Sequence, residues 1–413
     1  MLTGRRFRVD FTNEQAEYAE QIAGVCRAVW NTGLEQRREY RRRGAWMNYK
    51  PQAAELADAK AEHPWLAEAP GHCLQQTLMD LDKACRTHGT FRVRWRSARR
   101  WRPSFRFPEG NKMVVEKLNR RHARVKLPKL GWVRFRLSRP LNGALIRSAT
   151  VTREGRHWFV SFLVDDQEAT PPVHTAPDSA VGVDRGVVVA VATSDGQLRD
   201  RGFLSESERR RALRLQHRLS RADKHSRNRA KTRQALGVIR ARERHRRQDF
   251  CASTAHQLAA ENALVVIEAL KTKQMTRSAK GTLQEPGTNV KAKSGLNRAI
   301  LAKGWHQFAL ALASASRYSG TRVVTVPPHY TSQRCSQCGH VDPKSRESQA
   351  VFRCTHCSYT EHADVNAAKC ILAAGLAVTA CEDPLQPSGL VASPKQEPAG
   401  NREELLLQSH TAA

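Results

Sequence analysis

The chain has 413 residues, enough for two to four domains and at least one large core. It carries 69 Lys and Arg against 39 Asp and Glu, a formal net charge of +30, and this excess predicts a polyanionic partner, above all nucleic acid. The sequence shows neither a run of 18 apolar residues nor a signal-peptide core, so we expect no membrane partner. The ten cysteines indicate a reducing compartment, where closely paired thiols favour a metal over a disulfide.

The N-terminal part predicts one strand and two amphipathic helices. Residues 7–11 alternate like a short strand, and Thr12 with Gln15 has the pattern of a capping box. Gly44 is expected to end the first helix. Each helix is expected to bury one apolar stripe, to which we assign no functional role. The stripes are Ile22, Cys26, Trp30 and Leu34 on the first helix and Leu74, Leu78, Leu81 and Cys85 on the second.

Residues 91–107 and the runs that follow alternate apolar or aromatic side chains with arginine. Glu154-Gly155-Arg156 predicts a hairpin turn before the strand 157–164. We interpret this part as an antiparallel barrel or sandwich with one cationic face, suited to phosphate contact and base stacking. The alternative interpretation is that these arginines simply occupy the solvent-exposed face of ordinary strands and bind nothing. The arginines of the later runs are Arg134, Arg136, Arg147 and Arg153.

A proline-rich linker at 170–177 precedes a second domain that begins near Ser179. Residues 204–250 are predicted to be helical, and residues 201–250 hold 17 Lys and Arg against five acids. That density favours helices that follow a nucleic-acid backbone over a merely solvated basic face. Residues 271–294 predict a mobile basic loop, and an amphipathic helix with Leu301, Trp305, Phe308 and Leu312 follows.

Two acids stand at the ends of apolar, strand-like runs. Asp184 follows AVGV, with Gly182 and Gly186 expected to let the backbone bend beside it, and Glu268 follows ALVVI. A carboxylate buried in such a place needs a partner, a proton or a cation. An acid that simply caps a turn is the alternative for Asp184.

A third acid, Asp364, opens the helical run 364–374, and a helix cap is the alternative for it. Carboxylate oxygens are the ligands that Mg²⁺ prefers, and two such ions can stabilise the attacking and leaving oxygens at a phosphodiester. We therefore expect Asp184, Glu268 and Asp364 to be catalytic Mg²⁺ ligands of a nuclease.

The cysteines form the most specific pattern. Cys335-x-x-Cys338 and Cys354-x-x-Cys357, with fifteen residues between the pairs, predict a four-thiolate Zn²⁺ site. Four thiolates leave no open coordination position, so this zinc is expected to be structural.

In this order, VGVDRG, VVIEAL, LNRAILAKGWHQF, VPPHYTSQRCSQCGHVD, FRCTHC and HADVNAA resemble the TnpB (OrfB) proteins of insertion sequences, which are related to the type V CRISPR effector nucleases. The resemblance is strong over residues 180–376 and looser before them. It implies a RuvC-like, RNase H-type nuclease with Mg²⁺ on the three acids and zinc on the four cysteines. Family members often carry an acid or Asn where this chain has Ala269.

The resemblance implies a multidomain α+β fold: an N-terminal antiparallel β-barrel (wedge) with a helical recognition insert, and a C-terminal RNase H-like (RuvC) α/β domain with an inserted zinc knuckle. The expected parts are the wedge at 1–11 and 100–172, the recognition insert at 12–99, the nuclease domain at 178–330 and 361–376, the zinc knuckle at 331–360 and a disordered tail at 377–413.

The resemblance implies that the activity is RNA-guided cleavage of DNA. It also implies a monomer that binds a guide RNA and both double-stranded and single-stranded target DNA. The expected location is a prokaryotic cytoplasm, on the nucleoid when bound to DNA. Two alternatives stay open: an RNA-guided DNA-binding regulator that does not cleave, and an accessory transposition protein. A plain zinc-ribbon transcription factor would leave Asp184 and Glu268 without a role.

Overall fold

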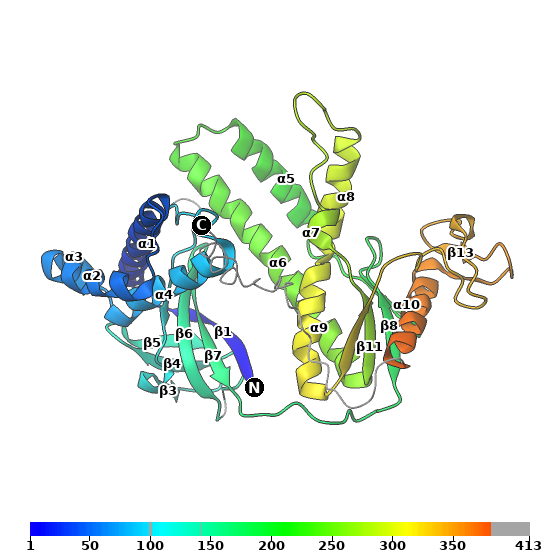
Figure 1. Ribbon diagram of the computed structural model, residues 1–413, viewed down its shortest axis with the longest axis horizontal. Helices are drawn as coiled ribbons and strands as arrows, with labels where there is room; N and C mark the ends of the chain where they lie inside the picture. The colour runs from blue at the N-terminus through cyan, green and yellow to red at the C-terminus, as the bar shows by residue number, and fades with distance from the viewer. Residues whose placement is uncertain (99–100, 142, 381–413) are drawn as a thin grey trace, which may run out of the picture. The chain divides into compact units, whose positions relative to one another are not determined.

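The computed structural model describes residues 1–98, 101–141 and 143–380, which form two compact units divided at the 169–170 boundary (Figure 1). This boundary coincides with the start of the predicted linker. The predicted tail lies outside the described residues from 381 onward.

The first unit is built on a seven-stranded antiparallel sheet, with the strand order β2-β6-β7-β1-β5-β4-β3. The two edge strands are not paired to each other among the described residues, so a closed barrel is not confirmed. The predicted hairpin is confirmed, with Gly155 at φ 60° in the turn. The strands are β1 (Leu2–Asp10), β2 (Ser104–Phe107), β3 (Val114–Lys117), β4 (His122–Leu127), β5 (Gly131–Arg136), β6 (Leu145–Glu154) and β7 (His157–Asp165), and the turn η1 (Gly110–Lys112) precedes β3.

Aromatic rings fill the centre of this unit. The ring centroid of Phe7 on β1 lies 5.2 Å from that of Phe135 on β5 and 5.9 Å from that of Phe162 on β7. The predicted capping box between Thr12 and Gln15 is present, and both predicted helix stripes are buried in the same core. The helices are α1 (Asn13–Arg42), α2 (Tyr49–Glu62), α3 (Pro64–Glu68) and α4 (Gly71–His88).

The arginine–aromatic run 91–96 is not a strand, contrary to the prediction. It is irregular and tied to α1 by side-chain hydrogen bonds: Trp30 Nε1 donates to Arg94 O at 3.2 Å, and Arg38 Nη2 donates to Val93 O at 2.8 Å. Alternation alone cannot distinguish an extended segment bound to a helix from one paired in a sheet.

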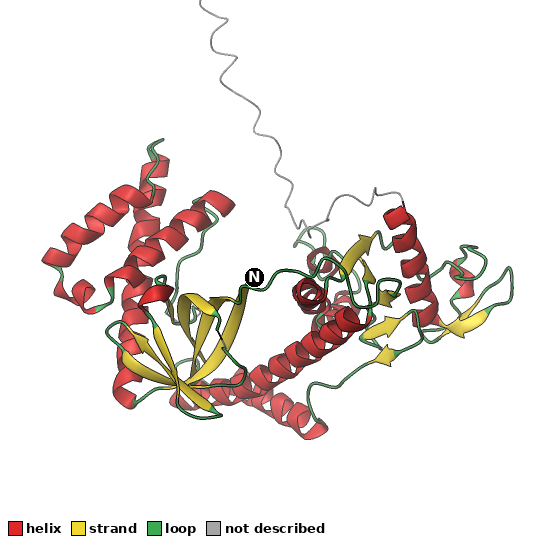
Figure 2. Ribbon diagram, turned by 90° about the horizontal axis from the view of Figure 1, so that it is seen from below, coloured by secondary structure: helices red, strands yellow, loops and turns green. Residues whose placement is uncertain are grey.

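The second unit is built on a sheet with helices packed beside it (Figure 2). The sheet has five strands in the order β10-β9-β8-β11-β12. Strands β8, β11 and β12 are parallel, and β9 and β10 are antiparallel to their neighbours. Alternate residues of β11 face opposite layers: Val265 and Ile267 pack with α6 and α9, and Val266 packs with Ile371 of α10. The strands are β8 (Ala180–Asp184), β9 (Val191–Thr193), β10 (Leu198–Arg199), β11 (Leu264–Glu268) and β12 (Arg322–Val326).

The predicted basic helices form a hairpin, α5 (Glu206–Arg221) and α6 (Arg227–Glu261). The predicted loop 271–294 contains α7 (Thr272–Met275) and the start of α8 (Val290–Lys303). The amphipathic helix expected across Leu301 and Leu312 is broken at Gly304, whose φ of 75° ends α8 and starts α9 (Trp305–Ser319).

Helix α10 (Ala363–Ala380) lies directly on β8, where Gly182 makes the contact possible. A Cβ atom on Gly182 would lie 2.1 Å from Ala368 O. The glycine therefore permits close packing of a helix, and not the backbone bend that we predicted. By length and apolarity α10 could span a membrane, but half of it is buried in this unit, as in a core helix.

Candidate functional site

The fold brings the three predicted acids to one edge of the second sheet. Strands β8 and β11 are parallel neighbours, so Asp184 and Glu268, each the last residue of its strand, lie at the same carboxyl edge. Asp364 reaches the same place from the first turn of α10. All three line a cavity of about 700 Å³. Carboxyl ends of strands are where open α/β sheets bind their ligands.

The site concentrates buried negative charge. The exposed fraction is 7% for Glu268 and 3% for Asp364. Burial, and then repulsion from these two carboxylates, raises the pKa of Asp184 to about 7. Such a cluster is stabilised by protons or by cations, which is the chemistry of a divalent-metal site.

Protein groups satisfy two of the carboxylates. Arg346 Nη2 donates to Asp364 Oδ1 at 3.0 Å, and Thr331 Oγ1 donates to Glu268 Oε1 at 2.7 Å. Asp364 is the second residue of α10 and not its cap, and its partner is this arginine. The helix-cap alternative is therefore not supported.

A buried arginine next to Asp184 connects the edge of the sheet to α9 by hydrogen bonds. Arg185 is 5% exposed and donates to the backbone carbonyls of Glu268 and Trp305, so its guanidinium joins the end of β11 to the start of α9. Trp305 Nε1 donates in turn to Gly186 O at 3.1 Å. No role was predicted from the sequence for Arg185, Thr331 or Arg346. Only the position of Arg185 beside Asp184 could have indicated a role.

The oxygen-rich donor set suits Mg²⁺, although the carboxylates do not converge as tightly as the thiolates. Among the described residues, the cysteine quartet is the group whose ligand atoms all lie within 4.8 Å of one another. In this state Arg346 occupies part of the space beside Asp364.

The four predicted cysteines come together in the segment between β12 and α10. Cys335 Sγ lies 3.7 Å from Cys357 Sγ, and Cys338 Sγ lies 3.6 Å from Cys354 Sγ. Sulfurs at about 2.3 Å from a tetrahedral Zn²⁺ would be about 3.8 Å apart, so the quartet fits this ion. The segment also holds η2 (Pro343–Ser345), β13 (Val351–Arg353) and β14 (Thr360–His362).

A single asparagine joins the cysteine segment to the helix of Asp364. Asn366 is fully buried; its Nδ2 donates to Arg334 O at 2.8 Å, and its Oδ1 accepts from Ser336 N at 2.9 Å. These contacts flank Cys335, so the metal segment and the acid site share one structural support. This role of Asn366 was not predicted from the sequence.

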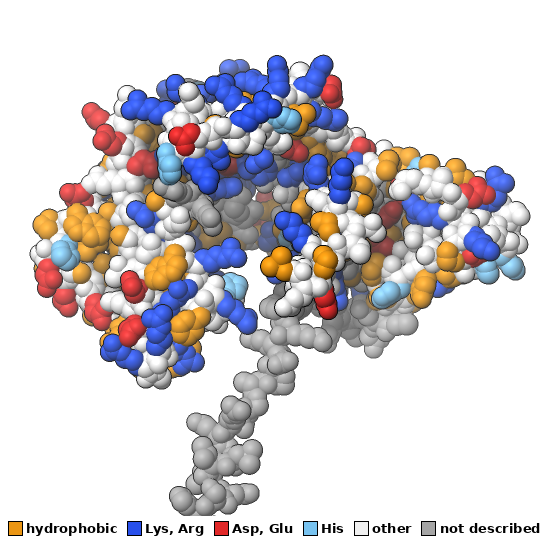
Figure 3. Space-filling model, turned by 90° about the horizontal axis from the view of Figure 1, so that it is seen from above, with side chains coloured by type: hydrophobic (Ala, Val, Ile, Leu, Met, Phe, Trp, Pro, Cys, Tyr) orange, Lys and Arg blue, Asp and Glu red, His pale blue; other side chains and the backbone are white. Residues whose placement is uncertain are grey.

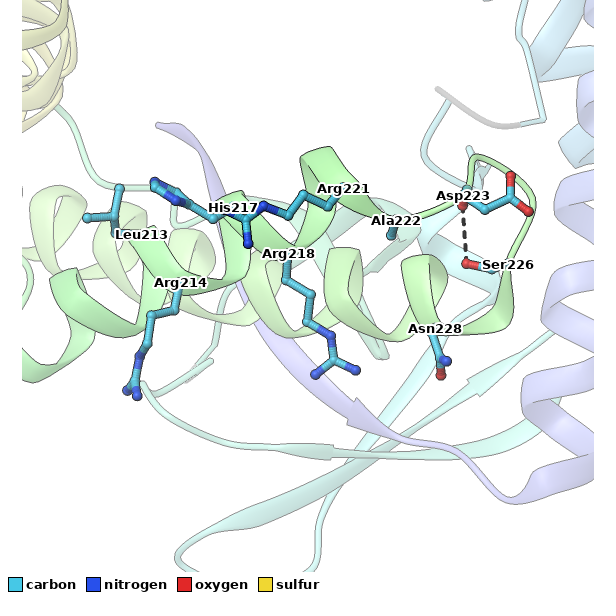
Figure 4. Close-up of a pocket in the computed structure, with 9 residues that line it drawn as sticks. All are labelled: Leu213, Arg214, His217, Arg218, Arg221, Ala222, Asp223, Ser226 and Asn228. Atoms are coloured by element: carbon cyan, nitrogen blue, oxygen red, sulfur yellow. Dashed lines mark hydrogen bonds between the residues drawn. The ribbon is translucent and has the colours of Figure 1, made fainter.

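The basic hairpin presents unpaired arginines. At the start of α5, Arg209 and Arg210 lie within 4 Å of Glu206, as ion pairs do. Further along α5, Arg214 and Arg218 have no ion-pair partner among the described residues and extend to the same side of the helix (Figure 4). They line a shallow pocket of about 710 Å³.

Lys and Arg are also the commonest charged side chains over the face seen in Figure 3. A surface with exposed, unpaired arginines suits a phosphate backbone.

Comparison with protein-family models gives three matches along the chain. A model described as "Probable transposase" (OrfB_IS605) matches residues 161–279, and one described as "Cas12f1-like, TNB domain" matches 305–371. A model described as "Helix-turn-helix domain" matches 1–45. In that range the structure has β1 and the single long helix α1, and not two helices joined by a turn.

Two relatives match almost the whole chain. The "Putative RNA-guided DNA endonuclease InsQ" of Escherichia coli (strain K12) is 36% identical over 95% of this chain and 96% of its own. A "Putative RNA-guided DNA endonuclease" of Streptomyces pristinaespiralis is 31% identical over 93% of this chain and 92% of its own.

Among solved structures, the Cas12f1 chain of the "Cryo-EM structure of the Cas12f1-sgRNA-target DNA complex" is similar in fold, with a TM-score of 0.56 at 14% identity over 88% of this chain and 83% of that one. Because the similarity to InsQ extends over nearly all of both chains, the chain belongs to the TnpB (OrfB) family of insertion-sequence proteins.

Proposed function

We propose that this protein is an RNA-guided DNA endonuclease. The observation that carries the proposal is the convergence of Asp184, Glu268 and Asp364 on one cavity at the carboxyl edge of the second sheet. The names of the two long relatives and the net charge of +30 support the guide RNA and the DNA target as partners. We extend the proposal to a monomer that binds its RNA in a prokaryotic cytoplasm.

Within this proposal the second unit is the RNase H-like (RuvC) nuclease domain. Its mixed sheet, with acids at the ends of two adjacent parallel strands, supports this assignment, and residues 331–360 form its zinc knuckle. The sheet of the first unit acts as the wedge, and the helices within 12–99 act as the recognition insert. In such a division of labour, base pairing with the guide selects the target sequence, and the protein binds mainly backbone.

The three carboxylates would hold Mg²⁺, which when bound supplies Lewis-acid stabilisation of the oxygens around the scissile phosphate. Glu268 is kept in place by the hydroxyl of Thr331, and Asp184 by its position at the end of β8. The Arg346 guanidinium lies in the same cavity and can pair with a phosphate oxygen once a cation occupies the carboxylates.

Substitution of the most central acid tests the proposal. Asp184→Ala should abolish cleavage of a guide-matched DNA duplex while RNA-guided binding persists, because the change removes a metal ligand and leaves the basic surfaces intact. Cleavage by the wild type should require added Mg²⁺. A purified Asp184→Ala protein that still cuts would overturn the assignment, and a wild type that binds without cutting would favour the non-cleaving regulator.

A further inference from the structure

The helical part of the first unit carries a row of exposed aromatic rings stacked with arginines. Arg41 lies over Trp46, with its Cζ atom 4.0 Å from the ring centroid, and Arg38 lies over Trp95 at 4.7 Å. The two arginines are three residues apart on α1, so the two stacks are adjacent on one side of the helix.

These rings are displayed to solvent. The exposed fraction is 68% for Trp46, 44% for Trp95 and 56% for the neighbouring Phe91. Large exposed aromatic side chains grouped together mark an interaction site more often than ordinary surface. We call these three rings, together with Arg38 and Arg41, the stacking row.

The backbone that holds the row is rigidly attached. Arg38 Nη2 donates to Phe91 O at 3.3 Å and to Val93 O at 2.8 Å, and Val93 is buried in the core of the unit. Asn31 Nδ2 donates to Arg96 O at 3.2 Å, and Asn31 Oδ1 accepts from Arg96 N at 2.9 Å. The row is therefore pre-organised, which lowers the entropic cost of binding.

The other end of the row is fixed by a turn. Gly44, at φ 78°, reverses the chain after α1, and Ala45 N donates to Tyr40 O at 2.9 Å. Met47 is buried and anchors the chain on the far side of Trp46. The indole of Trp46 is held out to solvent by this turn, with Arg41 stacked on it.

The charges of the row are available to a ligand. Neither Arg38 nor Arg41 has a carboxylate partner among the described residues, and Arg38 Nε is buried without a hydrogen-bond partner. The nearby acid on α1, Glu39, is already paired with Arg42 and Arg43. Arg41 is exposed and Arg38 is half-buried, while Arg92 and Arg94, in the same segment as Phe91 and Trp95, are exposed, so positive charge accompanies the aromatic rings.

From this arrangement we infer that the stacking row binds a single-stranded segment of nucleic acid, with bases stacked on Trp46, Trp95 and Phe91 and phosphates paired with the exposed Arg41 and with Arg94, which precedes Trp95 in the chain. Stacking on an aromatic platform requires unpaired bases, which distinguishes this surface from one that follows a duplex backbone. The inference rests on the proposed nucleic-acid partners but not on cleavage, and RNA and DNA strands share the chemistry that the row recognises.

Binding of short oligonucleotides to the full-length, nuclease-treated Asp184→Ala protein tests the inference. Fluorescence anisotropy with a ten-nucleotide single strand, as RNA and as DNA of the same sequence, should show that Trp46→Ala and Trp95→Ala each weaken binding about 5-fold or more. Binding of a duplex should be unchanged. Because no charge is removed, the salt dependence of single-strand binding should keep its slope.

The chain offers a matched control. Trp65 on α3 is 45% exposed, as Trp95 is, but has no arginine stacked on it among the described residues, so Trp65→Ala should leave single-strand binding unchanged. Trp46→Phe should restore most of the affinity that Trp46→Ala removes, because a ring remains. The nucleic acid whose affinity falls further, RNA or DNA, is the strand that the row holds.

Two results would overturn the inference. One is equal single-strand affinity in the Trp46→Ala, Trp95→Ala and Trp65→Ala proteins, and the other is an equal decrease in affinity for single strands and duplexes. A protein that bound no nucleic acid in any form would instead contradict the proposed function itself, so the two failures are distinguishable.

Discussion

Asp184 is expected to titrate near neutral pH, because burial and two neighbouring carboxylates raise its pKa to about 7. In the unfolded chain this group titrates near its ordinary value of about 3.9, so between the two values the folded state holds a proton that the unfolded state has released. Without metal, stability contributed by that proton is complete below pH 4 and declines as the pH rises toward 7.

We therefore expect the melting temperature of Mg²⁺-free protein to fall between pH 5 and 8 in the wild type, and to fall less in Asp184→Asn, which has no carboxyl group to ionise there. The difference corresponds to roughly 1.4 kcal/mol for each unit of pKa shift. Thermal unfolding across this pH range measures it. Added Mg²⁺ should remove this pH-dependent difference in melting temperature between the wild type and Asp184→Asn. If the difference did not grow with pH in the absence of Mg²⁺, the raised pKa would be contradicted.

Arg346 offers a second test at the same site. Arg346→Ala removes the guanidinium that contacts Asp364 and should slow cleavage on the order of 100-fold, because positive charge at the phosphate is removed. Arg353→Ala is the matched control, since Arg353 lies in the same knuckle but pairs with Glu347, with 59% of its side chain exposed. Cleavage assays with pre-formed RNA–protein complex compare the two. Equal cleavage rates in the two variants would show that Arg346 has no role in cleavage.

The sequence predicted the acids better than it predicted their partners, for a physical reason. Asp184 and Glu268 stand at the ends of apolar runs, and parallel strands bring such ends together. Arg346 reaches the site from the zinc segment, which packs against α10, and Thr331 follows the carboxyl end of β12, the neighbour of β11; no local pattern encodes either contact. The roles of the acids themselves stay predictions.

The elements themselves were more predictable where periodicity was long and uniform. The buried stripes of α1 and α4 follow directly from apolar spacing, and β11 follows from the continuous apolar run before Glu268. The exceptions were set by tertiary contacts or by single glycines: residues 91–96 bind to α1 instead of a strand, and Gly304 breaks one expected helix into α8 and α9.

Coupling between the zinc knuckle and α10 can be tested through Asn366. Asn366→Ala leaves Ser336 N without its partner and Arg334 O with the Cys370 thiol as its remaining side-chain donor, at a cost of about 1 kcal/mol for each lost hydrogen bond. We expect faster release of zinc to a coloured chelator and a lower melting temperature. Thr379→Ala, at the exposed end of the same helix, should change neither. Unaltered zinc release in Asn366→Ala would show that the zinc knuckle and α10 are not coupled through this residue.

The hairpin of α5 and α6 allows a charge-matched comparison. Changing Arg214 and Arg218 together to Gln removes two unpaired charges. It should weaken nucleic-acid binding and reduce the slope of log K against log salt by about 1 for each phosphate that the protein no longer neutralises. Changing Arg209 and Arg210 to Gln removes the same charge from arginines beside Glu206 and should have the smaller effect. Salt titrations of RNA binding decide between them, and equal slopes in the two variants would contradict a specific role for the unpaired pair.

At the scale of the whole molecule, the charge of +30 makes the protein's stability depend on its partner. Without a polyanion, the excess of Lys and Arg repels itself, and salt relieves this repulsion because the screening length falls from about 30 Å at 0.01 M to about 8 Å at physiological ionic strength. Bound RNA would neutralise the same charges, and salt would then weaken the complex by competing for its phosphates.

The two forms should therefore respond to salt in opposite directions. We expect the melting temperature of nuclease-treated protein to rise between 50 and 500 mM NaCl, and that of the protein saturated with its copurifying RNA to start higher and fall over the same range. Thermal unfolding of both preparations, with sequencing of the RNA, measures this. If nuclease-treated protein melted independently of salt, or if RNA did not raise its melting temperature, the basic surface would not be the main RNA-binding feature of the chain, and recognition would have to depend on uncharged contacts such as base stacking on Trp46 and Trp95.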